Sequence, residues 1–207
     1  MIDYYALLQL PRLPYLDEEE LKQHFLELSS PLHPDRFSQA SQAEQQAANE
    51  RYAELNAAYN CLREPRKRLL HLIELERQSK PPDIQRIPPG TMDLFVEVGQ
   101  TCRQVDEFLA ERSKADSPML KARLFQAGLE WADKLQTLHQ RVNARKKELN
   151  DELRAMNDSW IKAPPIGDKE RLASLPLERL EQIYRIYSYI SRWEEQIQER
   201  LVQLTLT

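Results

Sequence analysis

The residues with the clearest capacity for chemistry are His33, Pro34 and Asp35, a triplet between two segments with helical patterns. Proline fixes the backbone angle φ and removes a hydrogen-bond donor, so it stiffens a tip between two helices. The carboxylate of Asp35 is an acceptor that can pair with an arginine or lysine of a partner, and Arg36 follows directly. A rigid, polar tip of this kind suits recognition of a partner better than covalent chemistry.

Outside this triplet the sequence offers few of the groups that a catalytic site needs. It has no glycine-rich phosphate loop, no G-x-G-x-x-G turn and no H-E-x-x-H pair. His24, His71 and His139 stand alone on predicted helices, where nothing pairs them for acid–base work. Cys61 and Cys102 lack a Cys or His at metal-ligand spacing, and we interpret them as small buried side chains. We therefore expect no enzyme activity, no metal and no cofactor.

Charge and hydropathy argue against nucleic-acid and membrane partners. The net charge of −4 is mild, and the basic runs at 63–68 and 143–147 lie among acids without interleaved aromatic residues. We interpret both basic runs as solvent-exposed faces of helices. No apolar run approaches the length that spans a bilayer, and the first residues, MIDYYALLQLP, already resemble folded sequence. We expect a soluble protein of the bacterial cytoplasm, with neither a nucleic-acid nor a membrane partner.

The first part of the chain predicts a helical hairpin. Four glycines against thirteen prolines favour long helices with proline at their ends. Asp17 is positioned to cap a helix that runs to about Ser30, and Ser41 with Glu44 forms a capping box for the next one. Pro65 ends that second helix or restarts the chain at a first helical turn. Each of the two helices has an apolar stripe, and the connection between them is short. We therefore expect the two helices to pack antiparallel.

A proline-rich segment, 79–90, separates this part from the remainder and predicts a linker. The domains expected are therefore 1–78, the linker 79–90, and 91–207. Three helices are predicted in 91–207: from Met92 to Arg112, from Ser117-Pro118 to about Trp160, and a last one with heptad spacing. Helices with apolar residues along one face pack together, so these three predict a small antiparallel three-helix bundle. The predicted fold class is all-α.

The setting of the triplet resembles the J-domain, the short helical module that stimulates ATP hydrolysis by DnaK-class heat-shock chaperones. The resemblance covers residues 2 to about 76 and rests on DYYALLQLP, the helix with Phe25, His33-Pro34-Asp35 and LNAAYNCLREPRKR. A J-domain followed by a linker and a bundle resembles the HscB (Hsc20/Jac1) family, the co-chaperones of iron–sulfur cluster assembly. DLFVEVGQTCRQVDEFL is similar to the helix that opens that family's bundle, and RIYSYISRWEEQIQERLVQL to its closing helix.

This resemblance implies two partners and no cofactor. The loop residues His33, Pro34, Asp35 and Arg36, with Lys22 on the preceding helix, would contact the nucleotide-binding domain of a DnaK/HscA-type chaperone ATPase. The contact would favour the hydrolysis-competent state and so shift the partner's conformational equilibrium. An iron–sulfur scaffold protein would bind apolar residues of the bundle. By position, these residues are Phe95, Val96, Gly99 and Ile186.

The sequence also departs from the pattern of these families. Leu26 and Glu27 occupy positions that are often basic in J-domains, and SSPL replaces a basic-aromatic approach to the triplet. Fewer positive charges predict weaker steering toward an acidic chaperone surface. Gly99 stands where a large apolar residue is expected, and close helix packing is one explanation for it.

Three alternatives stay open at this point. Phe95 and Ile186 are core residues if their stripes are buried. The bundle has a different client or forms a homo-oligomer, while the J-domain keeps its role. The third alternative is a structural helical adaptor in which the triplet is incidental.

Overall fold

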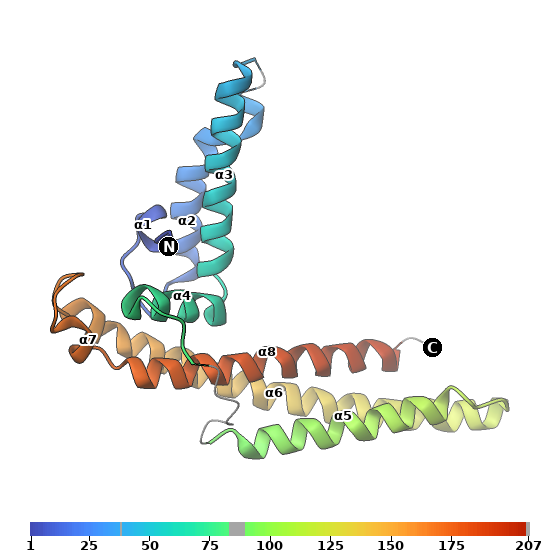
Figure 1. Ribbon diagram of the computed structural model, residues 1–207. Helices are drawn as coiled ribbons and strands as arrows, with labels where there is room; N and C mark the ends of the chain where they lie inside the picture. The colour runs from blue at the N-terminus through green and yellow to red at the C-terminus, as the bar shows by residue number, and fades with distance from the viewer. Residues whose placement is uncertain (38, 83–89, 206–207) are drawn as a thin grey trace. The chain divides into compact units, whose positions relative to one another are not determined.

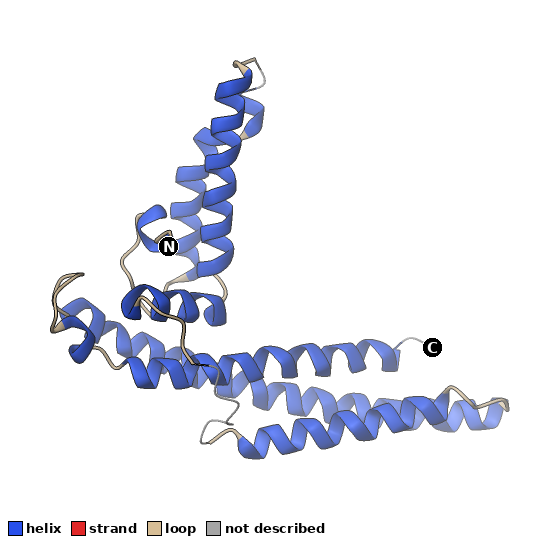
Figure 2. Cartoon of the chain, in the orientation of Figure 1, coloured by secondary structure: helices blue, strands red, loops and turns tan. Residues whose placement is uncertain are grey.

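A computed structural model describes residues 1–37, 39–82 and 90–205 of the chain. These residues form helices and connecting loops with no strand among them, which confirms the predicted all-α fold class (Figures 1 and 2). The helices, in chain order, are α1 (Tyr4–Leu7), α2 (Glu18–Ser29), α3 (Gln42–Leu62), α4 (Pro65–Arg77), α5 (Met92–Arg112), α6 (Pro118–Lys162), α7 (Arg171–Ser174) and α8 (Leu177–Thr205). Two short 3₁₀ turns, η1 (Ser30–Leu32) and η2 (Pro34–Phe37), lie between α2 and α3.

The chain divides into two compact units, and each is built from two stretches of sequence. The first comprises Met1–Asp83 and Asn150–Tyr184, and the second comprises Ile84–Leu149 and Arg185–Thr207. Helices α6 and α8 therefore each contribute one part to the first unit and the other part to the second. Residues 83–89 of the predicted linker lie outside the described residues. The division into the domains 1–78 and 91–207 stays a prediction.

The centre of the first unit is an antiparallel hairpin of α2 and α3 (Figure 1). Asp17 caps α2 by accepting hydrogen bonds from the backbone of Glu19 and Glu20, and Ser41 with Glu44 forms the predicted capping box of α3. Each cap satisfies donors that a helix start leaves without intrahelical partners. The two apolar stripes then face each other. Their buried members include Leu21, Leu55, Ala58 and Leu62.

Helix α4 begins with Pro65 at its first turn, as the sequence predicts. It crosses the base of the hairpin in Figure 1 and buries Leu69, Leu72 and Ile73. Arg68 is also buried there, and it donates hydrogen bonds to the carbonyl oxygens of Pro14 (3.0 Å) and Leu62 (2.7 Å). The prediction that the basic run 63–68 is a solvated helix face is therefore wrong for Arg68, because two backbone acceptors replace the water that its guanidinium loses.

Within the first unit, charged side chains join α4 to α7 and to the start of α8. Arg171 donates from Nε and Nη2 to the two carboxylate oxygens of Glu76, at 2.8 and 2.7 Å, and both residues are buried. Arg77 forms a second ion pair with the largely buried Glu181 at 2.7 Å. Glu76 and Glu181 can be buried because each is matched by an arginine from a distant segment.

The second unit consists of α5, the N-terminal part of α6 and the C-terminal part of α8, and α6 runs antiparallel to the other two helices (Figure 1). Its core is a set of side chains at helical spacing from all three elements: Val98, Cys102, Val105, Phe108, Leu135, Leu138, Val142, Leu149, Ile186, Tyr187, Ile190 and Ile197. Glu194 interrupts the stripe of α8, and Lys146 pairs with it at 2.8 Å. Helix α6 is continuous over 45 residues, or about 67 Å at 1.5 Å per residue.

Candidate functional site

The loop between α2 and α3 is a compact tip. Helix α2 continues as η1, after which His33 takes an extended conformation with φ −60° and ψ 134°, as the residue before a proline prefers. Turn η2 follows, and the amide of Arg36 donates to the carbonyl oxygen of His33 at 2.9 Å. Consecutive short turns hold the backbone of the triplet close to the ends of both helices. The side chains of Pro34 and Asp35 lie outside the described residues.

The His33 ring is exposed and packs edge-on against Tyr52 of α3, with ring centroids 5.9 Å apart and an interplanar angle of 85°. One turn before the loop, Phe25 of α2 stacks on Tyr59 of α3 at 4.5 Å. Aromatic pairs in such geometries stabilise beyond the area they bury. These two pairs bridge the hairpin and position the loop. Tyr52 was not among the predicted site residues, because no local signal connects it to His33.

A groove of about 420 Å³ lies beside the loop. It is lined by Phe25, Leu26, Ser29, Ser30, His33, Arg36 and Tyr52, so α2, the loop and α3 all contribute. Leu26 is 51% exposed and supplies an apolar rim, while exposed Arg36 supplies a positive charge. Lys22 lies one turn before Leu26 on α2, where it is exposed and 4.0 Å from Glu19. The arrangement offers hydrogen bonds, one apolar contact and positive charge to a partner.

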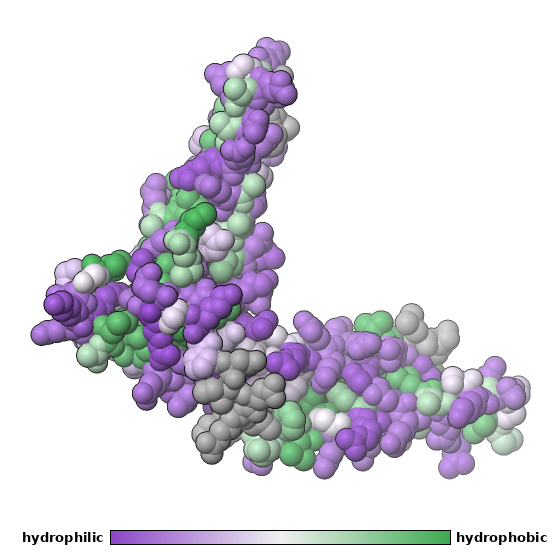
Figure 3. Space-filling view, viewed as in Figure 1, coloured by the Kyte–Doolittle hydropathy of each residue, from purple (hydrophilic) through white to green (hydrophobic). Residues whose placement is uncertain are grey.

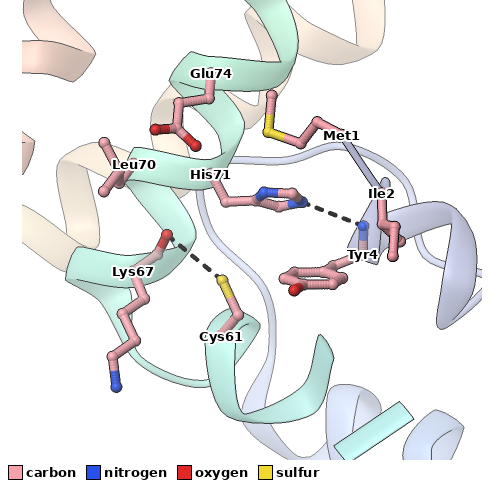
Figure 4. A pocket seen from close by; sticks show the side chains of 8 residues that line it. All are labelled: Met1, Ile2, Tyr4, Cys61, Lys67, Leu70, His71 and Glu74. Atoms are coloured by element: carbon pink, nitrogen blue, oxygen red, sulfur yellow. Dashed lines mark hydrogen bonds between the residues drawn. The ribbon is translucent and has the colours of Figure 1, made fainter. Parts of the chain in front are cut away.

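A second hollow, of about 400 Å³, lies between the N-terminus, the end of α3 and α4 (Figure 4). Nε2 of His71 accepts a hydrogen bond from the amide of Tyr4 at 3.2 Å, and burial lowers the pKa of His71. The Cys61 thiol contacts the carbonyl oxygen of Lys67 at 3.7 Å, and burial raises its pKa to about 11. A neutral, hydrogen-bonded imidazole and a protonated thiol make this hollow a structural site, since only a thiolate is a good nucleophile.

The four residues predicted to bind a scaffold protein do not form one surface. Phe95 and Val96 are 39% and 42% exposed, and Gly99 is exposed as well. Ile186 has no exposed area. Its side chain packs in the bundle core and cannot reach a partner, so the predicted binding role of Ile186 is replaced by the core alternative. For Phe95 exposure excludes a purely core role, and hydrophobic atoms gather over this part of α5 in Figure 3.

Comparison with known proteins identifies the N-terminal part. Residues 3–71 match the DnaJ domain family, as the sequence resemblance predicts for this part of the chain. The crystal structure of the human co-chaperone protein HscB matches 96% of this chain and 84% of its own, with a TM-score of 0.54 and 22% identity. The chaperone HscB from Vibrio cholerae matches 95% of this chain and 99% of its own, with a TM-score of 0.46 and 20% identity. The match to the human protein shows that the fold of this chain is similar to that of HscB.

No helix among the described residues is long and apolar enough to cross a membrane. No group of three or more His, Cys, Asp and Glu side chains in residues 1–37, 39–82 and 90–205 is placed to hold a metal ion.

Proposed function

We propose that this protein is a non-enzymatic co-chaperone whose J-domain stimulates ATP hydrolysis by a DnaK/HscA-type chaperone. The match of residues 3–71 to the DnaJ domain supports this role. The observation that carries it is the placement of His33, which stands exposed at a stiff tip and rests against Tyr52. Such a tip stimulates by binding one conformation of the chaperone more tightly than the other, and it donates no catalytic group.

Single-turnover ATP hydrolysis by the purified chaperone, with and without this protein, tests the proposal. We expect wild type to raise the hydrolysis rate and His33→Gln to lose most of that effect. His139→Gln on α6 is the matched control, because it makes the same chemical change outside the J-domain, and it should stimulate like wild type. Equal stimulation by wild type and His33→Gln would remove the loop from the mechanism.

We further propose that the bundle delivers an iron–sulfur scaffold protein to the chaperone. Exposed Phe95 and Val96 on α5 support this role, and the HscB-type fold agrees with it. The test is the affinity for purified scaffold protein, measured by calorimetry. Phe95→Ala should weaken binding while the thermal stability stays close to that of wild type. Ile186→Ala, in contrast, should lower stability, because it leaves a cavity in the core.

A general co-chaperone with a different client is the second candidate. It is favoured by Gly99, which stands where the resemblance expects a large apolar residue. Pull-down with the scaffold protein distinguishes the two functions. If the scaffold is not retained while ATPase stimulation persists, the J-domain role stands and the scaffold is not the client.

A further inference from the structure

Helix α6 carries two apolar stripes along its N-terminal part. The first is buried in the bundle and consists of Leu124, Leu135, Leu138 and Val142. The second follows the 4-3-4-3 spacing of a coiled-coil seam and consists of Pro118, Ala122, Phe125, Leu129 and Ala132. At about 100° per residue, the two stripes lie roughly 125° apart around the helix axis. The second stripe, which we name the Phe125 stripe, therefore faces away from the bundle core.

The Phe125 stripe is open to solvent. Phe125 and Leu129 are 53% and 47% exposed, and Pro118 and Ala122 are exposed as well. Single exposed apolar residues are common on protein surfaces, but these follow one face of a helix over about 21 Å. A stripe of this kind is buried when another helix packs an apolar stripe of its own against it. The described parts of α5 and α8 leave the Phe125 stripe uncovered, so a helix that covers it comes from another molecule.

The stripe is complementary in size to a second copy of itself. We consider an antiparallel pair with a two-fold axis at the level of Ala127, midway between Phe125 and Leu129. Each Phe125 then faces the Leu129 of the other copy. Further from the axis, Ala122 lies opposite Ala132, and small residues at these positions let the two helices approach closely. The same patch thus serves both copies, as a closed two-fold dimer requires.

Exposed charges beside the stripe favour the antiparallel direction. Arg123 and Asp133 lie on one flank of the Phe125 stripe, and Lys121 lies on the other. The antiparallel two-fold axis brings like flanks together, and along the helix it places Arg123 of one copy within about 3 Å of the level of Asp133 of the other. A parallel pair brings unlike flanks together, so Arg123 would lie beside the Lys121 of the other copy. Opposite charges therefore meet in the antiparallel pair, and like charges meet in the parallel one.

The remaining charges of this part of α6 do not cancel that preference. Within residues 1–37, 39–82 and 90–205, the three charged residues just named form no ion pair. Glu130 is exposed on the same flank as Asp133, so it adds a second acid near Arg123 of the other copy. The ammonium of Lys134 lies 4.2 Å from the ring centroid of Trp131. Since Trp131 packs on α5, this cation lies on the side of α5 and not beside the Phe125 stripe.

We propose that two copies of this chain associate through the Phe125 stripe, with the N-terminal parts of their α6 helices packed antiparallel. The inference does not depend on the chaperone or the scaffold as partners. Only two large apolar side chains of each copy enter the contact, so its area lies below that of a standard stable interface. We therefore expect a weak, reversible dimer with a dissociation constant on the order of 10⁻⁵ to 10⁻⁴ M.

Sedimentation equilibrium of the full chain in low salt tests the association. Wild type at concentrations from about 5 to 500 µM, which bracket this constant, should shift from monomer to dimer. Phe125→Glu places a charge at the centre of the stripe and should stay monomeric. Val202→Glu is the matched control, because it makes a similar change at an apolar residue of α8 that is 46% exposed, and it should dimerise like wild type. Wild type that stays monomeric overturns the proposal and leaves the stripe to a different partner. Dimerisation of Phe125→Glu equal to that of wild type overturns it as well.

An exchange of charges tests the direction of the pair. Arg123→Asp sets two aspartates opposite each other at two symmetric places, so it should raise the dissociation constant about threefold to tenfold. Asp133→Arg should do the same with two arginines, and the double variant should return the constant to near that of wild type. Circular dichroism should show unchanged helix content in all three variants, since both positions are exposed. A tighter dimer in Arg123→Asp would indicate parallel helices, and a double variant as weak as the single ones would exclude this ion pair. Either result contradicts the proposed arrangement.

Discussion

Arg171 of α7 and Glu76 of α4 form a buried, two-pronged ion pair, in which the two side chains are 9% and 2% exposed. A third bond, from Nη1 of Arg171 to the carbonyl oxygen of Pro164 at 2.7 Å, helps to satisfy the guanidinium. The pair links residues 95 positions apart in the sequence. It fixes the last helix of the N-terminal part to the α7 segment within the first unit.

Removal of the Glu76 charge should destabilise the first unit. Glu76→Ala leaves the Arg171 cation buried without its counter-charge, and such losses cost about 3–5 kcal/mol. Urea denaturation measures the change in the free energy of unfolding. Glu54→Ala is the control, because both side chains of its ion pair with Arg51 are exposed and such a pair contributes about 0–1 kcal/mol. Similar values for the two variants would show that burial does not set the strength of the Arg171–Glu76 pair.

This pair also shows where sequence reasoning stops. The helix starts were predictable because their signals are local: Asp17, the Ser41–Glu44 box and Pro65 each act within one turn. The burial of Glu76 was not predictable, because its partner Arg171 lies in a distant segment and charged residues of helices are mostly exposed. Its burial can be known only from the tertiary fold.

The candidate sites divide in the same way. The loop with His33 was predictable because its triplet, its flanking helices and their caps agree with one another. The burial of Ile186 and the exposure of Phe95 were not predictable. Both residues belong to apolar stripes, and helical periodicity alone does not distinguish a buried position from one at the edge of the core. Tyr189 of α8 meets the ring of Phe95 edge-on. This contact was not predicted, because no local signal in the sequence connects α8 to Phe95. The only available signal was the excess of apolar residues on one face of α5.

Stability should fall as the pH is lowered through the titration range of His71. Burial and the hydrogen bond from the Tyr4 amide favour the neutral ring, so the pKa of His71 is lowered in the folded state. Between that pKa and the unfolded value of about 6.5, the unfolded chain binds more protons. The stabilisation is therefore complete above about pH 6.5 and is lost as the pH falls through the folded-state pKa.

The measurement is the free energy of unfolding by urea at pH ~7.5 and pH ~5.5. His71→Gln keeps an acceptor for the Tyr4 amide but does not titrate, so its stability should change less with pH than that of wild type. His139→Gln is the control and should retain the wild-type dependence. The neighbouring Asp3 and Arg12 are unchanged in both variants. An unaltered pH dependence in His71→Gln would assign the effect to other groups.

The capping box of α3 should stabilise the helix start next to the loop. Ser41 Oγ accepts from the amide of Glu44, and the Glu44 carboxylate accepts from the amide of Ser41 at 2.9 Å. Ser41→Ala removes the side-chain acceptor and should cost about 1 kcal/mol. Hydrogen exchange should quicken at the first amides of α3, while Ser41→Asp, which restores an acceptor, should behave like wild type. Unchanged exchange in Ser41→Ala would mean that the cap contributes nothing to the order of this helix start.

Leu26 should determine how strongly the chaperone contact depends on salt. Its exposed side chain lines the groove beside His33, at a position that is often basic in J-domains. Leu26→Lys places a second cation one turn after Lys22, and exposed charges attract a partner more strongly when ionic strength is low. We expect this variant to reach half-maximal ATPase stimulation at a lower concentration than wild type in low salt, and to lose that advantage as KCl is raised.

Leu26→Gln separates the effect of the added charge from that of the lost apolar side chain. It removes the apolar rim of the groove and adds no charge, so its half-maximal concentration should rise modestly and by the same factor at all salt concentrations. His33→Gln combined with Leu26→Lys should still fail to stimulate, because the added charge brings the partners together but does not replace the tip. If Leu26→Lys and Leu26→Gln both match wild type from low to high KCl, the chaperone does not contact this groove, and recognition is confined to the loop itself.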